Sequence, residues 1–93
     1  MAQSIKRKSA SAQAEERMIA AEIAKSNRFT ACLHLGPGNR HTADGMTSYE
    51  EAQEAAAQLN EMSQYGRRAI IYAVTKLGSF PCDDALIALA RSL

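Results

Sequence analysis

The spacing of hydrophobic and polar residues changes along the chain, and these changes predict alternating helices and strands. From Ser9 or Ser11 to Lys25, helix-compatible residues follow one another without Pro or Gly, which predicts a helix. Its apolar stripe is weak and consists of Ala14, Met18 and Ala21, with Ile19 and Ile23 beside it. Such a stripe suits a helix that packs on one neighbour, either its own domain or a second copy.

Residues 28 to 35 alternate with a period of two, which is the pattern of a half-buried strand. Four apolar side chains share the buried face, namely Phe29, Ala31, Leu33 and Leu35, and the other face holds Arg28, Thr30, Cys32 and His34. Turn residues occupy 36–39, and Asp44-Gly45 is a second turn signal. Residues 40 to 46 are therefore either a short returning strand or a loop, and we favour the hairpin.

The second helix is predicted over residues 47–65. Thr47 and Glu50 have the spacing of a capping box, and Gly66 is suited to end the helix in the left-handed conformation. Five residues form its buried stripe: Ala52, Ala55, Ala56, Leu59 and Met62.

Residues 67–75 are rich in β-branched and aromatic side chains on both faces, so they predict a central strand. Pro81 places residues 79–82 at a sheet edge, because proline cannot donate to a ladder. Asp83 is expected to cap a last helix, with Arg91 complementing its carboxyl end. The side chains expected to face inward on this helix are Ala85, Leu86, Leu89 and Ala90.

Together these elements predict an α+β fold of two layers, with a small sheet of three strands, or four if the hairpin forms. Helices 47–65 and 83–92 cover the sheet, and the amino-terminal helix is available to cover its other face. If the first and central strands are adjacent and parallel, helix 47–65 is a right-handed βαβ-like crossover. We divide the chain into a flexible basic tip at 1–8, a helix at 9–26 and one domain at 27–93.

Length and composition limit the size of this core. The chain has 93 residues, of which 46% are apolar, and eighteen of these are alanines, so the core is thin. No apolar run approaches the ~20 residues of a membrane span, and the amino terminus lacks the pattern of a secretory signal. We therefore expect a cytoplasmic protein whose two cysteines, Cys32 and Cys82, are thiols that fill space in the fold.

Motifs that would bring a cofactor or a metal are poorly matched. Gly36-Pro37-Gly38 leads into a turn and lacks the residues of a phosphate-binding loop. Cys32, His34, His41 and Cys82 lack the paired spacing of a zinc site, and no base accompanies either thiol. We therefore expect no cofactor, no metal and no catalytic residue.

Charged residues suggest two surfaces. Helix 47–65 carries no Lys or Arg and has four carboxylates that form a candidate acidic docking face: Glu50, Glu51, Glu54 and Glu61. Six basic residues are candidate contacts for anions or nucleic acid: Lys6, Arg7, Lys8, Arg40, Arg67 and Arg68. The formal net charge of the whole chain is only +1, so the basic group is smaller than the usual nucleic-acid footprint.

Two segments, Thr47-Ser-Tyr-Glu-Glu-Ala52 and Gly66-Arg-Arg-Ala-Ile-Ile-Tyr-Ala-Val-Thr75, resemble small proteins of alphaproteobacteria and their phages. The resemblance covers about residues 28–76, and because that family has no assigned activity it implies no functional residue. A fainter resemblance is to arm-type DNA-binding modules of phage integrases, in which a hairpin precedes a Thr-x-x-Glu-Ala helix. This chain departs from those modules because its hairpin is poor in Lys and Arg and a further strand and helix follow.

These observations favour a small non-enzymatic module that acts through protein–protein contacts. The alternative is a DNA-associated accessory or regulatory protein that uses the basic tip with Arg67 and Arg68. A thin core and exposed sheet edges, at residues 79–82 or 28–35, favour a homodimer over a monomer. The competing interpretation is a monomer in which the amino-terminal helix covers the sheet and Pro81 blunts the edge.

Overall fold

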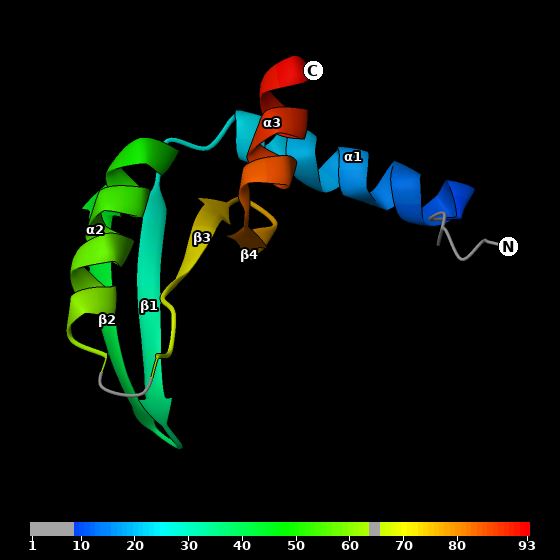
Figure 1. Cartoon of the computed structure of the whole chain (residues 1–93). Helices are drawn as coiled ribbons and strands as arrows, with labels where there is room; N and C mark the ends of the chain where they lie inside the picture. Colours follow the sequence, from blue (N-terminus) through cyan, green and yellow to red (C-terminus); the bar gives the residue numbers. More distant parts are fainter. Residues whose placement is uncertain (1–8, 64–65) are drawn as a thin grey trace, which may run out of the picture.

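The computed structural model describes residues 9–63 and 66–93, so the amino-terminal tip at 1–8 and residues 64–65 lie outside the described residues. Three helices and four strands follow one another as α1, β1, β2, α2, β3, β4 and α3 (Figure 1). Their bounds are α1 Ala10–Ala24, β1 Phe29–Gly36, β2 Asn39–Met46, α2 Tyr49–Glu61, β3 Ile70–Thr75, β4 Gly78–Cys82 and α3 Asp84–Ser92. The predicted α+β class is confirmed, and the sheet has four strands.

The sheet has the strand order β2-β1-β3-β4, and every neighbouring pair is antiparallel. Because β1 is antiparallel to both β2 and β3, those two strands run parallel to each other, and α2 connects them across β1. The prediction that β3 is central is confirmed. The parallel arrangement considered for the first and central strands is wrong, because β2 returns the chain before α2 begins. The crossover therefore starts from β2, and β1 is an interior strand with no free edge.

The favoured hairpin between β1 and β2 is present, but Asp44-Gly45 is not a turn. The register shifts between Phe29 and Ala31, where the opposing strand contains one additional residue. Gly45 has a φ of +89°, the left-handed conformation that glycine adopts at low cost. The Asp-Gly pair is therefore a bulge within β2, and β2 continues to Met46.

All three helices pack on one face of the sheet. The core side chains of the central strands are Phe29, Ala31, Ile71 and Ala73, which alternate along β1 and β3 and share a face. Helix α2 adds Ala52 and Ala56 to this cluster, α1 adds Ala20 and Ile23, and α3 adds Ile87 and Ala90. The expectation that the amino-terminal helix covers the opposite face is wrong, since α1 packs beside α3 and its first turns project beyond the sheet (Figure 1).

The buried stripes of the two terminal helices differ from the predicted ones. On α1, Ala20 and Ile23 are buried, whereas Met18 is 55% exposed and Ala14 is also exposed. On α3, Ile87 is buried and Ala85 is exposed. Both helices are rich in alanine, so adjacent stripes have similar apolarity and the tertiary contacts decide which one is buried.

The N-cap of helix α2 lies one residue later than predicted, and the helix ends earlier. Ser48 is its N-cap, with the backbone N–H of Glu51 donating to Ser48 Oγ at 3.2 Å. Glu51 Oε1 accepts from both the backbone N–H (2.9 Å) and the hydroxyl (2.7 Å) of Thr47. The helix ends at Glu61, and Met62, predicted as part of its buried stripe, is instead the C-cap and is 53% exposed. Gly66 has a φ of +70° but lies too far along the chain to cap the helix.

Candidate functional site

One face of the sheet is left without a helix among the described residues. Its side chains belong to the positions that alternate with the core positions on every strand. We call this surface the open sheet face, and its residues are Thr30, Cys32, His34, Arg40, Thr42, Ile70, Tyr72, Val74, Ser79 and Pro81.

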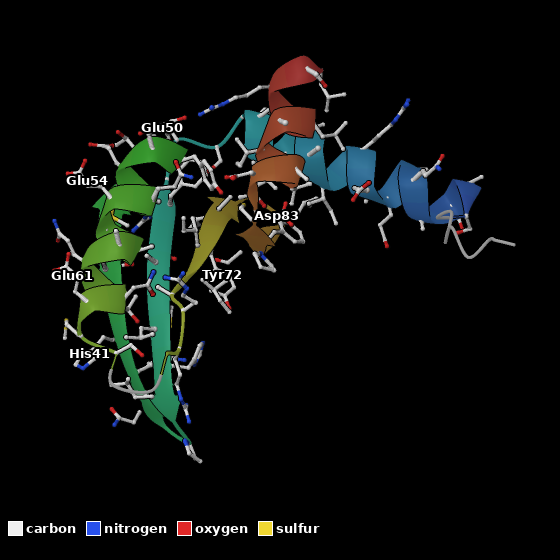
Figure 2. All side chains as sticks on the ribbon, in the orientation of Figure 1. His41, Glu50, Glu54, Glu61, Tyr72 and Asp83 are labelled. Atoms are coloured by element: carbon white, nitrogen blue, oxygen red, sulfur yellow. The ribbon has the colours of Figure 1, made fainter. Side chains whose placement is uncertain are left out.

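The middle of the open sheet face is apolar. Ile70 is 40% exposed, and Tyr72 and Val74 are half-buried on the same strand, with Pro81 opposite Tyr72 on β4. Figure 2 shows the Tyr72 ring projecting away from α2. The second face of β3, which is apolar in sequence, is therefore partly in contact with water.

Cys32 is buried although it belongs to the open sheet face, because its neighbours enclose it. Thr42 Oγ1 donates to Cys32 Sγ at 3.8 Å, and His34 Nε2 lies 3.6 Å from the same sulfur. Cys82 is on the core face, where burial raises the pKa of its thiol. The two cysteines thus lie on opposite faces of the sheet, and within residues 9–63 and 66–93 no group of His, Cys, Asp and Glu could hold a metal ion.

The structure brings the described basic candidates to one end of the sheet. Arg40 pairs with His34 in the β1–β2 ladder, and Arg67 Nη1 donates to the His34 carbonyl at 3.4 Å. Arg68 follows in the exposed segment before β3, which starts at Ile70 and not at residue 67. Lys6, Arg7 and Lys8 lie outside the described residues.

The four carboxylates of α2 do not act as one surface. Glu50, Glu54 and Glu61 lie on the side of the helix opposite Ala52 and Ala56, and Figure 2 shows Glu54 and Glu61 directed away from the other elements. Glu51 belongs to the helix cap, and the hydroxyl of Thr47 holds the pKa of this carboxyl below its usual value. The exposed acidic ridge therefore consists of Glu54 and Glu61, with Glu50 engaged elsewhere.

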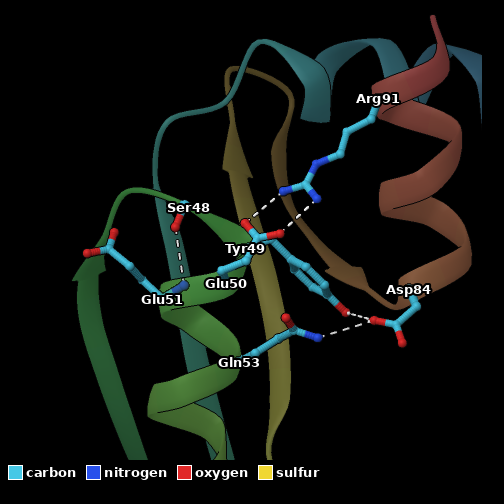
Figure 3. Close-up of polar contacts among 7 residues, drawn as sticks. All are labelled: Ser48, Tyr49, Glu50, Glu51, Gln53, Asp84 and Arg91. Carbon is cyan, nitrogen blue, oxygen red and sulfur yellow. Dashed lines mark hydrogen bonds and ion pairs between the residues drawn. The ribbon is translucent and has the colours of Figure 1, made fainter.

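Glu50 is bound by the last helix. Arg91 Nη2 donates to Glu50 Oε1 at 2.8 Å, and Nη1 lies 2.8 Å from Oε2, so the pair is bidentate (Figure 3). The hydrogen bond from Arg91 lowers the pKa of Glu50. Both side chains are exposed, so solvent screening keeps the energy of this pair small.

A second contact joins the same two helices, and sequence analysis missed it. The Tyr49 hydroxyl donates to Asp84 Oδ1 at 2.8 Å, and Gln53 Nε2 donates to the same oxygen at 3.3 Å (Figure 3). Tyr49 is only 6% exposed, and its ring meets Phe29 edge-on with centroids 6.4 Å apart. Burial, followed by the hydrogen bond to Asp84, raises the pKa of Tyr49 to about 12.

We call the contacts of Tyr49, Glu50 and Gln53 with Asp84 and Arg91 the helix clasp. It borders a cavity of about 180 Å³ between α1, α2 and α3, lined among others by Ile23, Phe29 and Ile87. Within the clasp, the contact with Arg91 lowers the pKa of Glu50, and burial together with the bond to Asp84 raises the pKa of Tyr49. The only sequence signal for the clasp was a tyrosine on an apolar stripe, because a buried hydroxyl needs a partner.

Comparisons with protein-family models, with curated proteins and with solved structures found no match to this chain. Within the described part of the chain, no helix combines the length and the apolar character needed to cross a bilayer.

Proposed function

We propose that this protein is a small non-enzymatic binding module that acts through protein–protein contacts, with the open sheet face as its contact surface. The single observation that carries this proposal is the partial exposure of Ile70, Tyr72 and Val74 in the middle of a sheet face, where Ile70 is exposed and the other two are half-buried. These side chains belong to the central strand, where a two-sided fold would bury them.

The composition of this surface suits a protein partner. Burying apolar side chains against a partner is favourable by roughly 25 cal/mol for each Å² removed from water. Aromatic residues and Arg are enriched at the centres of protein interfaces, and the open sheet face offers Tyr72 at its centre with Arg40 at its rim. The adjoining strands are held by backbone pairing, so the surface is rigid before it binds.

The side chains with displaced pKa values do not support a catalytic proposal. Glu51 is engaged in a helix cap, Tyr49 and Glu50 in the helix clasp, and Cys82 in the core. We also propose a cytoplasmic location, because both cysteines are free.

The proposal is tested with a photo-crosslinking amino acid at position 72, compared with the same amino acid at Gln58 on the solvent side of α2. We expect a discrete protein adduct from position 72 only, and we expect Ile70→Lys to abolish it. The captured protein, once purified, should bind the wild-type chain in calorimetry and bind the Ile70→Lys variant at least about tenfold more weakly. Equal adducts from both positions, or an adduct unaffected by Ile70→Lys, would contradict the proposal.

The alternative function is a DNA-associated accessory protein, and the gathering of Arg40, Arg67 and Arg68 at one end of the sheet favours it. Titration with duplex DNA at two salt concentrations tests it. Each phosphate contact contributes a slope of about −0.9 to the dependence of log affinity on log salt. The double substitution Arg67→Ala with Arg68→Ala should therefore flatten this slope by about two, while Lys76→Ala on the opposite turn should not.

A further inference from the structure

The two edges of the sheet differ in their capacity to accept another strand. Strand β2 is the outer strand on one side and β4 on the other. Residues 39 to 42 at the start of β2 are all exposed, and β2 contains no proline. An edge strand with unpaired backbone groups is a template for pairing with another chain.

The direction of the outward backbone groups follows from one hydrogen bond. The Val74 N–H donates to the Arg28 carbonyl at 2.9 Å, so even-numbered residues of β1 direct their backbone groups toward β3. Odd-numbered residues of β1 therefore bond to β2, where Ala31 is opposite Ala43 and Leu33 is opposite His41. On β2 the backbone groups of Arg40, Thr42 and Asp44 consequently point away from the sheet.

The alternation of backbone groups leaves the β4 edge blocked. Ile71 and Ala73 direct their backbone groups to β4, where they pair with Cys82 and Phe80. Ser79 and Pro81 therefore point outward, and Pro81 has no N–H to offer. This explains in physical terms why proline is tolerated at position 81.

The charges on the free β2 edge are self-complementary. If two copies of β2 pair antiparallel about a two-fold axis through Thr42, Arg40 of each copy lies opposite Asp44 of the other. Both residues are exposed, and together with Thr42 they alternate along one face of the strand. Opposite charges directly across an antiparallel pair are stabilising, and this register provides two such pairs.

From these observations we propose that two copies of the protein pair along β2, centred on Thr42, to form one continuous antiparallel sheet. The bulge at Asp44-Gly45 limits the straight stretch to residues 39–44. The interface is therefore small, below roughly 1,200 Å², which is the size range of weak and transient contacts.

This surface is the edge of the sheet and does not include Ile70, Tyr72 or Val74. The proposal therefore goes beyond the binding function assigned to the open sheet face. Substitutions at Arg40 and Asp44 leave the middle of that face intact, so either proposal can fail while the other stands.

Sedimentation equilibrium over a concentration series tests the dimer. We expect Arg40→Asp and Asp44→Arg each to raise the dissociation constant about tenfold or more, because each places like charges across the two-fold axis. The double variant Arg40→Asp with Asp44→Arg should restore dimerisation. Lys76→Asp on the β3–β4 turn is the matched control, with the same change of charge at a distance from the β2 edge, and it should have no effect.

Disulfide crosslinking provides an independent measurement. In a Cys32→Ser, Cys82→Ala background, Thr42→Cys should form a covalent dimer on mild oxidation, because residues on the axis face each other within disulfide distance. Ser79→Cys on the blocked edge is the control and should remain monomeric. A single-chain mass at all concentrations would overturn the proposal. So would a dimer that is unaffected by the charge reversals and is not crosslinked at position 42.

Discussion

Tyr49 and Asp84, which are 35 positions apart in the sequence, are joined by a 2.8 Å hydrogen bond between the first turns of α2 and α3. The donor is a phenol that is almost completely buried, and the acceptor carboxylate also accepts from Gln53. This bond connects the helix that crosses the sheet to the helix that ends the chain.

Replacing Tyr49 with Phe should lower the free energy of unfolding by about 1 kcal/mol. Because the ring contact with Phe29 is retained, the decrease in the free energy of unfolding measures the contribution of the Tyr49 hydroxyl alone. Tyr72→Phe is the matched control, because the structure gives the Tyr72 hydroxyl no partner among the described residues, and it should change stability by much less. Urea denaturation measures both variants, and equal losses would show that the clasp bond contributes nothing.

The raised pKa of Tyr49 predicts an alkaline limit to this contribution. The folded state favours the neutral phenol, so the stabilisation is fully present below the ordinary tyrosine pKa of about 10. It is lost as pH rises through the folded value of about 12. Absorbance titrations of the wild-type protein and of Tyr49→Phe should differ by one phenol that ionises near pH 12.

At acid pH the dependence of stability on pH has the opposite sign, so stability decreases as pH falls. Contacts from Arg91 and Thr47 lower the pKa of Glu50 and Glu51, so the folded state favours both carboxylates. Their stabilisation is present above the ordinary glutamate pKa of about 4.3 and is lost as pH falls through the lowered values. The urea midpoint of the wild type should therefore fall more steeply with decreasing pH than that of the Glu50→Gln, Glu51→Gln double variant.

Helix capping gives a prediction that separates two adjacent residues. Ser48→Ala removes the oxygen that accepts from the Glu51 backbone and should cost about 1 kcal/mol. Thr47→Ala removes only an exposed hydroxyl contact to the Glu51 side chain and should cost less. A larger loss at Thr47 in thermal or urea unfolding would place the start of α2 one residue earlier.

The bulge in β2 predicts a strict preference for glycine at position 45. Gly45→Ala should destabilise the fold by about 1 kcal/mol, because alanine is strained at a φ of +89° even though the space around Cβ is open. Gly45→Asn should cost less, since asparagine tolerates the left-handed region. If Gly45→Ala were as stable as the wild type, the backbone of the bulge would have to adopt another conformation that alanine tolerates.

Sequence patterns predicted the order of helices and strands well. They predicted less well which face of each helix is buried and where each helix begins and ends. Residues 47–51 contain both Thr-x-x-Glu and Ser-x-x-Glu, so the local motif is ambiguous by one residue. The burial of Tyr49, in phase with Ala52 and Ala56, selects the second motif, and that packing is not visible locally. The helix clasp was missed for the same reason, since its partners are 31 to 41 positions apart.

The location of β1 between the two strands of the crossover determines how the sheet assembles. Each hairpin, β1 with β2 and β3 with β4, pairs residues that are near neighbours in sequence, whereas Phe29 pairs with Ala73. Local contacts form fastest, because little chain entropy is lost in closing them. The seam between Phe29–Cys32 and Ile70–Ala73 therefore has the largest closure entropy of the three strand pairings, and we expect it to close last in folding.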